Sequence, residues 1–344
     1  MSESEIVLPI EEIKSVLTRV FNKNRLPDDE AAILIDTLLD AEFRGIKTHG
    51  LSRVGLYCQK IINGSIAIPT QITHVSDHYG AGCMDGHDGL GQWIAYKAMQ
   101  DAMSRAGRYG VGAVSVKNSQ HFGTAGYYAN MASDRDMIGL AFTNASPRLA
   151  PWGGVSKLLG NNPWSIAIPT HNPKIPFVLD ISNSMVSAGR IRQALRRGGK
   201  IPNSWALDIN GEATTDAQAA LLGVLLPFGQ HKGYGITLAI SILSSLLSGG
   251  EFDSEVKTID ESASKQHVSH LFVALNVDFF QPIQYFKERM GVLINQLHSS
   301  KVRSDVAQIY YPGERGYLQK WRLLEAKETS IDKMVWEGIV ALSK

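Results

Sequence analysis

The chain has 344 residues, of which 44% are hydrophobic and 19% are charged, and its formal net charge is +1. This composition is typical of a folded globular protein large enough for two domains, and it excludes disordered and collagen-like classes. The near-neutral charge argues against nucleic acid as a partner. The densest basic group is expected on a solvated helix or loop, and it consists of Arg192, Arg196, Arg197 and Lys200.

The first nine residues are acidic and lack an apolar signal segment, and no apolar run reaches the roughly 18 residues that span a bilayer. We therefore expect a cytoplasmic protein without a membrane partner. Cys58 and Cys83 are the only cysteines, too few for a Cys-x-x-Cys zinc or redox site, and both are expected to be reduced.

The N-terminal part of the chain has helical periodicity. The spacing of its apolar residues predicts helices over 11–22, 28–43 and 51–62. From about residue 70 the pattern changes, and it predicts a strand at 72–75, a turn-rich segment at 80–91 and a helix at 92–106.

Short apolar runs separated by glycine, proline and asparagine then predict a substantial sheet. The expected strands cover 111–116, 138–143, 164–168, 177–180 and 270–276. The uncharged segment Ile236–Leu247 predicts a buried helix, and helical periodicity returns at 283–299 and 331–342.

Several common catalytic signatures are missing from the sequence. The nearest match to the dinucleotide fingerprint, Gly110–Ser115, ends in serine and runs into a strand, so a Rossmann site is disfavoured. The phosphate-loop, His-Glu-x-x-His and nucleophile-elbow motifs do not occur. His267 and His270 lack a nearby carboxylate cluster, so we expect no metal site.

The segment Thr48–Arg53 opens the third predicted helix and is a candidate anion site. Arg53 and Tyr57 are one helical turn apart and share a face. An arginine can bind a carboxylate with two parallel hydrogen bonds, and the tyrosine hydroxyl can complete the pocket. Taken alone, the pair also fits a surface arginine beside a packing tyrosine.

Asn118–Gly123 follows a predicted strand and contains His121. A histidine at a strand end, among amides, hydroxyls and glycines, can approach a substrate and exchange a proton near neutral pH. A structural histidine bonded to loop carbonyls is the alternative.

The segment Gly229–Gly235 places glycines around Lys232 just before a helix, an arrangement that suits the binding of an anion. A tight turn with an exposed lysine is the alternative interpretation of this segment. The stretch Asn144–Pro169, which contains Ala145, is rich in glycine, proline and asparagine and predicts a long shaped loop that can build a binding site.

Read in order, these motifs resemble the malate/L-lactate dehydrogenase family, which includes sulfolactate, ureidoglycolate and 2,3-diketogulonate relatives. The resemblance covers nearly the whole chain. Its motifs are Arg44-Gly45, Thr48–Gly50, Arg53, Asn118–Gly126, Pro151–Gly154, Gly160–Pro163, Ile201–Trp205 with Asp208 and Gly211, Lys232-Gly233, Leu247–Gly250 and Tyr311–Glu314.

The resemblance implies an α/β (α+β) fold without a Rossmann unit, in which a mixed-sheet domain for cofactor and substrate (71–284) packs against a helical domain from both chain ends (1–70 and 285–344). It implies hydride transfer between a nicotinamide cofactor and a small 2-oxo or 2-hydroxy acid, and a homodimer. We expect NAD, with NADP possible.

The same resemblance assigns roles to individual residues. His121 is the expected general acid/base, with His49 and Arg53 in the catalytic pocket. The expected substrate contacts are Thr48, Tyr57, Asn118 and Ala145, and the expected cofactor contacts are Asp180, Ile181, Ser182, Lys232, Gly313, Glu314 and Arg315.

Two other functions remain open at the level of the sequence. A branch of the same family reduces cyclic imino acids such as piperideine-2-carboxylate. A protein that kept the fold but only binds a small molecule is the other possibility.

Overall fold

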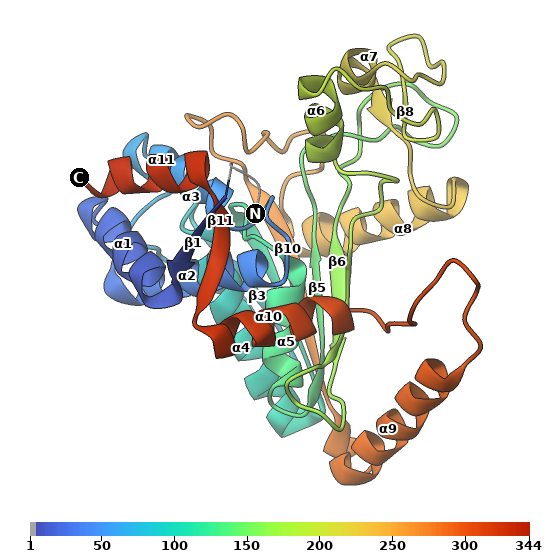
Figure 1. The fold of residues 1–344 in the computed structure, drawn as a ribbon. Helices are drawn as coiled ribbons and strands as arrows, with labels where there is room; N and C mark the ends of the chain where they lie inside the picture. The colour runs from blue at the N-terminus through green and yellow to red at the C-terminus, as the bar shows by residue number, and fades with distance from the viewer. Residues whose placement is uncertain (1–4) are drawn as a thin grey trace.

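The computed structural model describes residues 5–344 and is built around a seven-stranded mixed sheet (Figure 1). The strand order is β2-β3-β4-β10-β5-β6-β7. Only β3 and β4 are parallel, and every other neighbouring pair is antiparallel. The strands are β2 (Thr73–His78), β3 (Ala81–Asp85), β4 (Val111–Ser119), β5 (Met137–Thr143), β6 (Trp164–Ile168), β7 (Phe177–Ile181) and β10 (Val268–Asn276).

Helices α4 (Gly91–Tyr109) and α5 (Ala125–Ser133) pack on the sheet, α4 over β4 and β10 and α5 over β5 and β6. Two strand glycines make this close packing possible. A Cβ atom at Gly112 would collide with the carbonyl oxygen of Ala102 in α4, and one at Gly139 would collide with that of Ala129 in α5. Glycine in a strand interior commonly marks such a close approach of two backbones.

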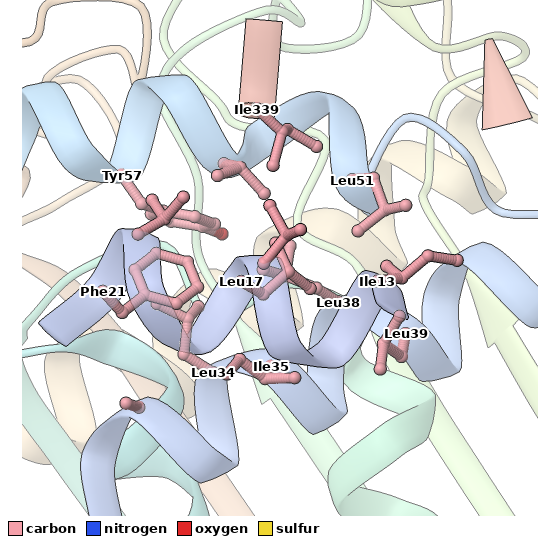
Figure 2. Close-up of a cluster of buried hydrophobic side chains, with 14 of the residues drawn as sticks. Ile13, Leu17, Phe21, Leu34, Ile35, Leu38, Leu39, Leu51, Tyr57 and Ile339 are labelled. Atoms are coloured by element: carbon pink, nitrogen blue, oxygen red, sulfur yellow. The ribbon is translucent and has the colours of Figure 1, made fainter. Parts of the chain in front are cut away.

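A helical cluster formed by both ends of the chain lies beside the sheet. It contains α1 (Ile10–Lys23), α2 (Asp28–Phe43), the short 3-10 turn Leu51–Arg53 with α3 (Val54–Ile62), and α11 (Lys333–Ser343). The strands β1 (Glu5–Pro9) and β11 (Glu328–Asp332) pair antiparallel and tie the two ends together. Figure 2 shows the buried side chains of this cluster, including those of Leu17, Leu38 and Ile339.

A third, smaller hydrophobic cluster was not predicted. It joins α6 (Ala188–Arg196), α7 (Ala217–Leu222), β8 (Ala206–Leu207) and β9 (Val224–Leu225) to the loop around Leu149. Figure 1 shows this unit at the end of the sheet opposite α9. It matters for function because α6 forms one wall of the cavity described below.

The fold is the predicted mixed α/β type, and several elements have their predicted bounds, among them α2, β6 and α9 (Ile283–Ser299). Others differ. The turn-rich segment 80–91 contains β3, and the predicted C-terminal helix begins only after β11. α10 (Glu314–Ala326) was not predicted. α9, expected in the helical domain, projects away from the helical cluster (Figure 1).

The segment Ile236–Leu247 is helical as predicted, but the prediction that it is buried on all sides was wrong. The segment forms α8 (His231–Ser241) followed by a π-helical turn (Ile242–Leu246), and it has one buried and one exposed face. The exposed face carries Leu238, Ile242, Leu243, Leu246 and Leu247. Absence of charge therefore does not mark burial within this single chain. Among residues 5–344, no helix is both long and apolar enough to cross a membrane.

Candidate active site

A cavity of about 200 Å³ lies where the helical cluster, the sheet and α6 meet. Its wall combines several separate parts of the sequence, four of which carry most of its polar side chains and backbone amides. They are Thr48, His49 and Arg53; His121 to Gly123 after β4; Asn144 to Ser146 with Arg148; and Ser187 to Gly189 with Arg192 from α6. Residues Ile259, Asp260 and Gln266 belong to a long loop that closes the remaining side. Of the predicted site residues, Thr48, His49, Arg53, His121 and Ala145 therefore share one cavity.

His121 follows β4 and is held on one side of its ring. Its Nδ1 lies 2.7 Å from the hydroxyl oxygen of Tyr57 and 3.4 Å from the backbone nitrogen of Gly123. Its backbone amide donates to Oε1 of Gln266 at 3.1 Å. Nε2 has no hydrogen-bond partner among residues 5–344. The ring therefore has one anchored nitrogen and one nitrogen available to a bound molecule.

Burial lowers the pKa of His121 well below its usual value, and His49 and Arg53 lower it further. His49 stacks on His121, with 5.5 Å between ring centroids and 21° between the planes. Burial also lowers the pKa of His49, to about 4, with smaller effects from Arg53 and Arg44. Both rings are therefore neutral near pH 7, and the cations beside them are arginines.

Arg53 is fixed at the end of the 3-10 turn. Its Nε donates to the carbonyl oxygen of Thr48 at 2.7 Å, while no carboxylate lies within ion-pair distance of its guanidinium among the described residues. An unpaired guanidinium in a cavity wall is a suitable partner for a substrate carboxylate. This placement agrees with the role expected for Arg53.

Tyr57 connects the helical cluster to the cavity. Its ring is 1% exposed and packs among the apolar side chains of α1 and α2 (Figure 2), while its hydroxyl reaches His121. Burial raises the pKa of Tyr57 above its usual value, so its phenol stays protonated. Tyr57 therefore contacts His121, and it does not line the cavity.

Asn118 also lies outside the cavity wall, although we expected it to contact the substrate. Its side-chain amide donates to both carboxylate oxygens of Asp85, at 3.0 and 2.9 Å, and its φ is +52°. Asparagine is among the few residues that adopt this left-handed conformation readily. The structure thus places Asn118 near the end of β4, three residues before His121.

The position of Ala145 depends on two buried polar side chains. Asn162 accepts a hydrogen bond from the Ala145 amide at 3.0 Å and donates to Asp253 at 2.7 Å. Asp253 also accepts from the Gly160 amide and from the hydroxyl of Ser241. Asn162 of the Gly160–Pro163 motif therefore holds this loop in position through its hydrogen bonds.

The predicted cofactor residues belong to β7 and to the segments that pack along it, outside the cavity wall. The Val178 amide in β7 donates to the Pro312 carbonyl just before α10, and the Phe228 amide near the start of α8 donates to the Asn183 carbonyl just after β7. Gly313, at φ +89°, packs so closely that a Cβ would lie 2.9 Å from the Val178 nitrogen. The start of α10 therefore packs against the beginning of β7, and the segment before α8 lies beside the residue that follows Ser182.

The side chains of these residues have different surroundings. Asp180 accepts from the Gly126 amide at 2.9 Å, which links β7 to the segment that carries His121, and burial raises the pKa of its carboxyl. Lys232 and Arg315 are exposed and have no ion pair among residues 5–344. The carboxylate of Glu314 is bonded to His298 and to the Tyr311 amide, so it faces inward.

Two arginines are among the cavity residues that were not predicted as functional. Arg148 lies in the loop Asn144–Pro169, and Arg192 was assigned to a solvated basic group, whereas it lines the cavity and pairs with Asp260 at 2.8 Å. The sequence signal for Arg148 was its position as the single arginine of the predicted loop.

His270, a candidate metal ligand, is buried between the hydroxyls of Thr143 and Ser119. No group of three or more potential ligands that could hold a metal occurs in residues 5–344.

Comparison with known proteins agrees with this architecture. The family model described as malate/L-lactate dehydrogenase matches residues 8–340. The chain is 39% identical to the malate dehydrogenase of Pyrococcus abyssi, over 92% of this chain and 89% of that protein. It is 37% identical to the L-sulfolactate dehydrogenase of Methanocaldococcus jannaschii, over 97% and 95%.

A solved structure extends the comparison. The malate dehydrogenase of Pyrococcus horikoshii OT3 superposes with a TM-score of 0.90 at 33% identity, covering 99% of this chain and 96% of that one. The resemblance seen in the sequence motifs is confirmed, and the chain belongs to the malate/L-lactate dehydrogenase family.

Proposed function

We propose that this protein is a nicotinamide-dependent oxidoreductase that interconverts a small 2-oxo acid and its 2-hydroxy acid. The observation that carries the proposal is the placement of Arg53 and His121 in one cavity, the first with an unpaired guanidinium and the second with a free ring nitrogen. We also propose that the helical cluster and the sheet act as two domains, one supplying Arg53 and the other His121.

The roles of the two residues follow from their chemistry. Arg53 would bind the substrate carboxylate and so fix the orientation of the adjacent carbonyl. In reduction, a hydride, which carries two electrons, goes to the carbonyl carbon, and Nε2 of protonated His121 gives its proton to the carbonyl oxygen, forming the hydroxyl group. In the reverse direction, Nε2 of neutral His121 accepts that proton, in the tautomer whose Nδ1–H donates to the Tyr57 hydroxyl oxygen.

The low pKa of His121 is compatible with this role. Arg53 is one of the charges that disfavour protonation of the ring. A substrate carboxylate bound to Arg53 neutralises that charge, so the pKa of His121 rises when substrate binds. The proton donor is therefore formed mainly in the complex, where it is needed.

The residues around β7 fit a dinucleotide. Lys232 and Arg315 supply unpaired cations at the first turns of α8 and α10, and helix N-termini favour phosphate groups. The close packing of Gly313 brings the start of α10 against β7. When bound, the nicotinamide supplies or accepts the hydride. We propose NAD as the cofactor of this chain.

Turnover is tested by following oxidation of NADH and of NADPH through near-ultraviolet absorbance, with pyruvate, oxaloacetate, sulfopyruvate and piperideine-2-carboxylate as substrates. We expect an oxo acid to be reduced with NADH, and the activity to collapse in His121→Ala. His171→Ala, a change at an exposed histidine, is the matched control. Reduction of the cyclic imine alone would show an imino acid reductase in place of a hydroxy-acid dehydrogenase. No turnover with either cofactor would refute the proposal that the protein is an enzyme.

We also propose that the protein is a homodimer. The exposed apolar face of α8 and its π-helical turn, with Leu243 39% and Leu247 59% exposed, is of the kind that subunit interfaces cover. Sedimentation analysis should give a dimer for the wild type and a shift toward monomer for Leu243→Glu. A monomeric wild type would contradict the proposal.

A further inference from the structure

The cavity wall carries more positive charge than a single substrate carboxylate can neutralise. Three arginines line it, Arg53, Arg148 and Arg192, whereas Asp260 is the one carboxylate among the lining residues. Arg192 donates to Asp260 at 2.8 Å, and the side chains of both are less than half exposed. Because His49 and His121 are neutral, the cavity has an excess of two positive charges, and neither Arg53 nor Arg148 forms an ion pair within residues 5–344.

Arg148 is rigidly placed. Its backbone amide donates to the carbonyl oxygen of Leu159 at 2.8 Å, and its own carbonyl accepts from the Leu225 amide at 2.8 Å. Its guanidinium donates to the hydroxyl of Thr258 at 3.2 Å and forms no ion pair within residues 5–344. Burial lowers the pKa of Arg148, and nearby Arg192 lowers it further. A partly buried cation held beside another cation is stabilised by an anion.

The two unpaired arginines belong to different ends of the cavity. Arg53 is a neighbour that depresses the pKa of both His49 and His121. Arg148 is instead bonded to Thr258, two residues before Asp260, which pairs with Arg192 of α6. One cation therefore lies at the reacting end, and the other lies at the end formed by α6.

The first turn of α6 adds to the positive potential at this second end. Ala188 and Gly189 line the cavity, and their backbone amides have no acceptor among the described residues. Ser187 caps the helix by accepting a hydrogen bond from the Arg190 amide. A helix N-terminus together with an unpaired arginine is a favourable site for an anionic group.

We propose that Arg148 and the N-terminus of α6 form a second anion subsite, so that the preferred substrate is a dianion with an acidic group, carboxylate or sulfonate, distal to its 2-oxo acid end. This inference rests on the proposed function, because that function places the 2-oxo acid end of the substrate at Arg53 and His121. Arg148 is then the residue that distinguishes dianionic from monoanionic substrates, because a monoanion such as pyruvate would leave its charge unpaired.

The experiment compares the steady-state kinetics of Arg148→Gln with oxaloacetate, sulfopyruvate and pyruvate. Loss of a charged hydrogen bond should lower kcat/KM for a dianion about 10- to 100-fold, mainly through KM, and should change that for pyruvate less than about threefold. Arg148→Lys keeps the charge and should restore part of the dianion activity. Arg196→Gln, at an exposed position at the C-terminal end of α6, is the matched control.

A proportional loss with all three substrates, or no loss with any, would overturn the subsite. Binding of L-malate and L-lactate to the protein with NADH present, measured by calorimetry, tests the subsite without turnover. Wild type should bind malate more tightly than lactate, and Arg148→Gln should remove the difference. If no oxo acid is reduced, the proposed enzyme fails, while this calorimetric comparison still decides whether Arg148 binds a second acidic group.

Discussion

The hydroxyl oxygen of Tyr57 lies 2.7 Å from Nδ1 of His121, although the two residues belong to different layers of the molecule. The tyrosine ring is part of the core of the helical cluster, and the histidine follows a strand of the central sheet. The packing of the two layers therefore sets the orientation of the ring whose other nitrogen is free to act on a substrate.

Replacing Tyr57 with phenylalanine removes this hydrogen bond and keeps the packed ring. We expect kcat/KM to fall about tenfold or more, because an unanchored ring spends less time in the reactive orientation. The thermal midpoint should change little, since the aromatic core is preserved. Tyr127→Phe, which removes a hydroxyl in the first turn of α5 that donates to Asp36 of α2, is the matched control. Equal activity of the two variants would contradict a positioning role.

The pH dependence of the reaction should report the depressed pKa of His121. In the oxidation of a hydroxy acid the neutral ring is the base, so kcat/KM should be constant through neutral pH and fall only in acid, below the usual histidine range. In Arg53→Gln, loss of the cation should raise the pKa of His121. Titration of isotope-labelled histidine by NMR measures this shift directly, and an unchanged or lower pKa in the variant would refute the electrostatic coupling.

How far the sequence predicts this structure depends on whether the determining interactions are local. α2 and α9 were predicted with their bounds because apolar periodicity is a local pattern. β1 and β11 were missed because each is five residues long and is stabilised by pairing with the other chain end. β3 was missed because glycines and polar residues surround it, and its partner β4 begins 26 residues after its own end at Asp85.

The same distinction applies to the site. Motifs placed His49, Arg53 and His121 in one pocket, and the cavity contains all three. Arg148 and Arg192 could not be found in this way, because their role depends on the charges that the fold brings near them. Arg192 stands in a run of basic residues whose other members are exposed, and only its contact with Asp260 separates it from them.

Lys60 should control the loop that closes the cavity. Its ammonium group is bonded to the carbonyl oxygens of Glu261 and Ser264, at 3.1 and 2.9 Å, and the residue is 1% exposed. Lys60→Met removes both bonds from the loop that carries Ile259, Asp260 and Gln266. We expect KM for the oxo acid to rise several-fold, with a smaller change in kcat. Lys14→Met, at a surface position of α1, should leave KM unchanged.

Acid should destabilise the protein through its buried histidines, and His270 is the clearest case. His270 is fully buried between two hydroxyls, and burial lowers its pKa to about 3. The unfolded chain binds a proton near pH 6.5, so the stabilising contribution is complete above that pH and is lost as the pH falls toward 3. Between pH 6.5 and 5 the loss should be on the order of 2 kcal/mol for this residue.

Denaturant unfolding of His270→Gln at the two pH values should show a correspondingly smaller decrease in the free energy of unfolding, because other titrating groups contribute equally to both proteins. His171→Gln, at an exposed position, should keep the wild-type dependence, and an equal decrease in all three proteins would show that His270 is not the group responsible.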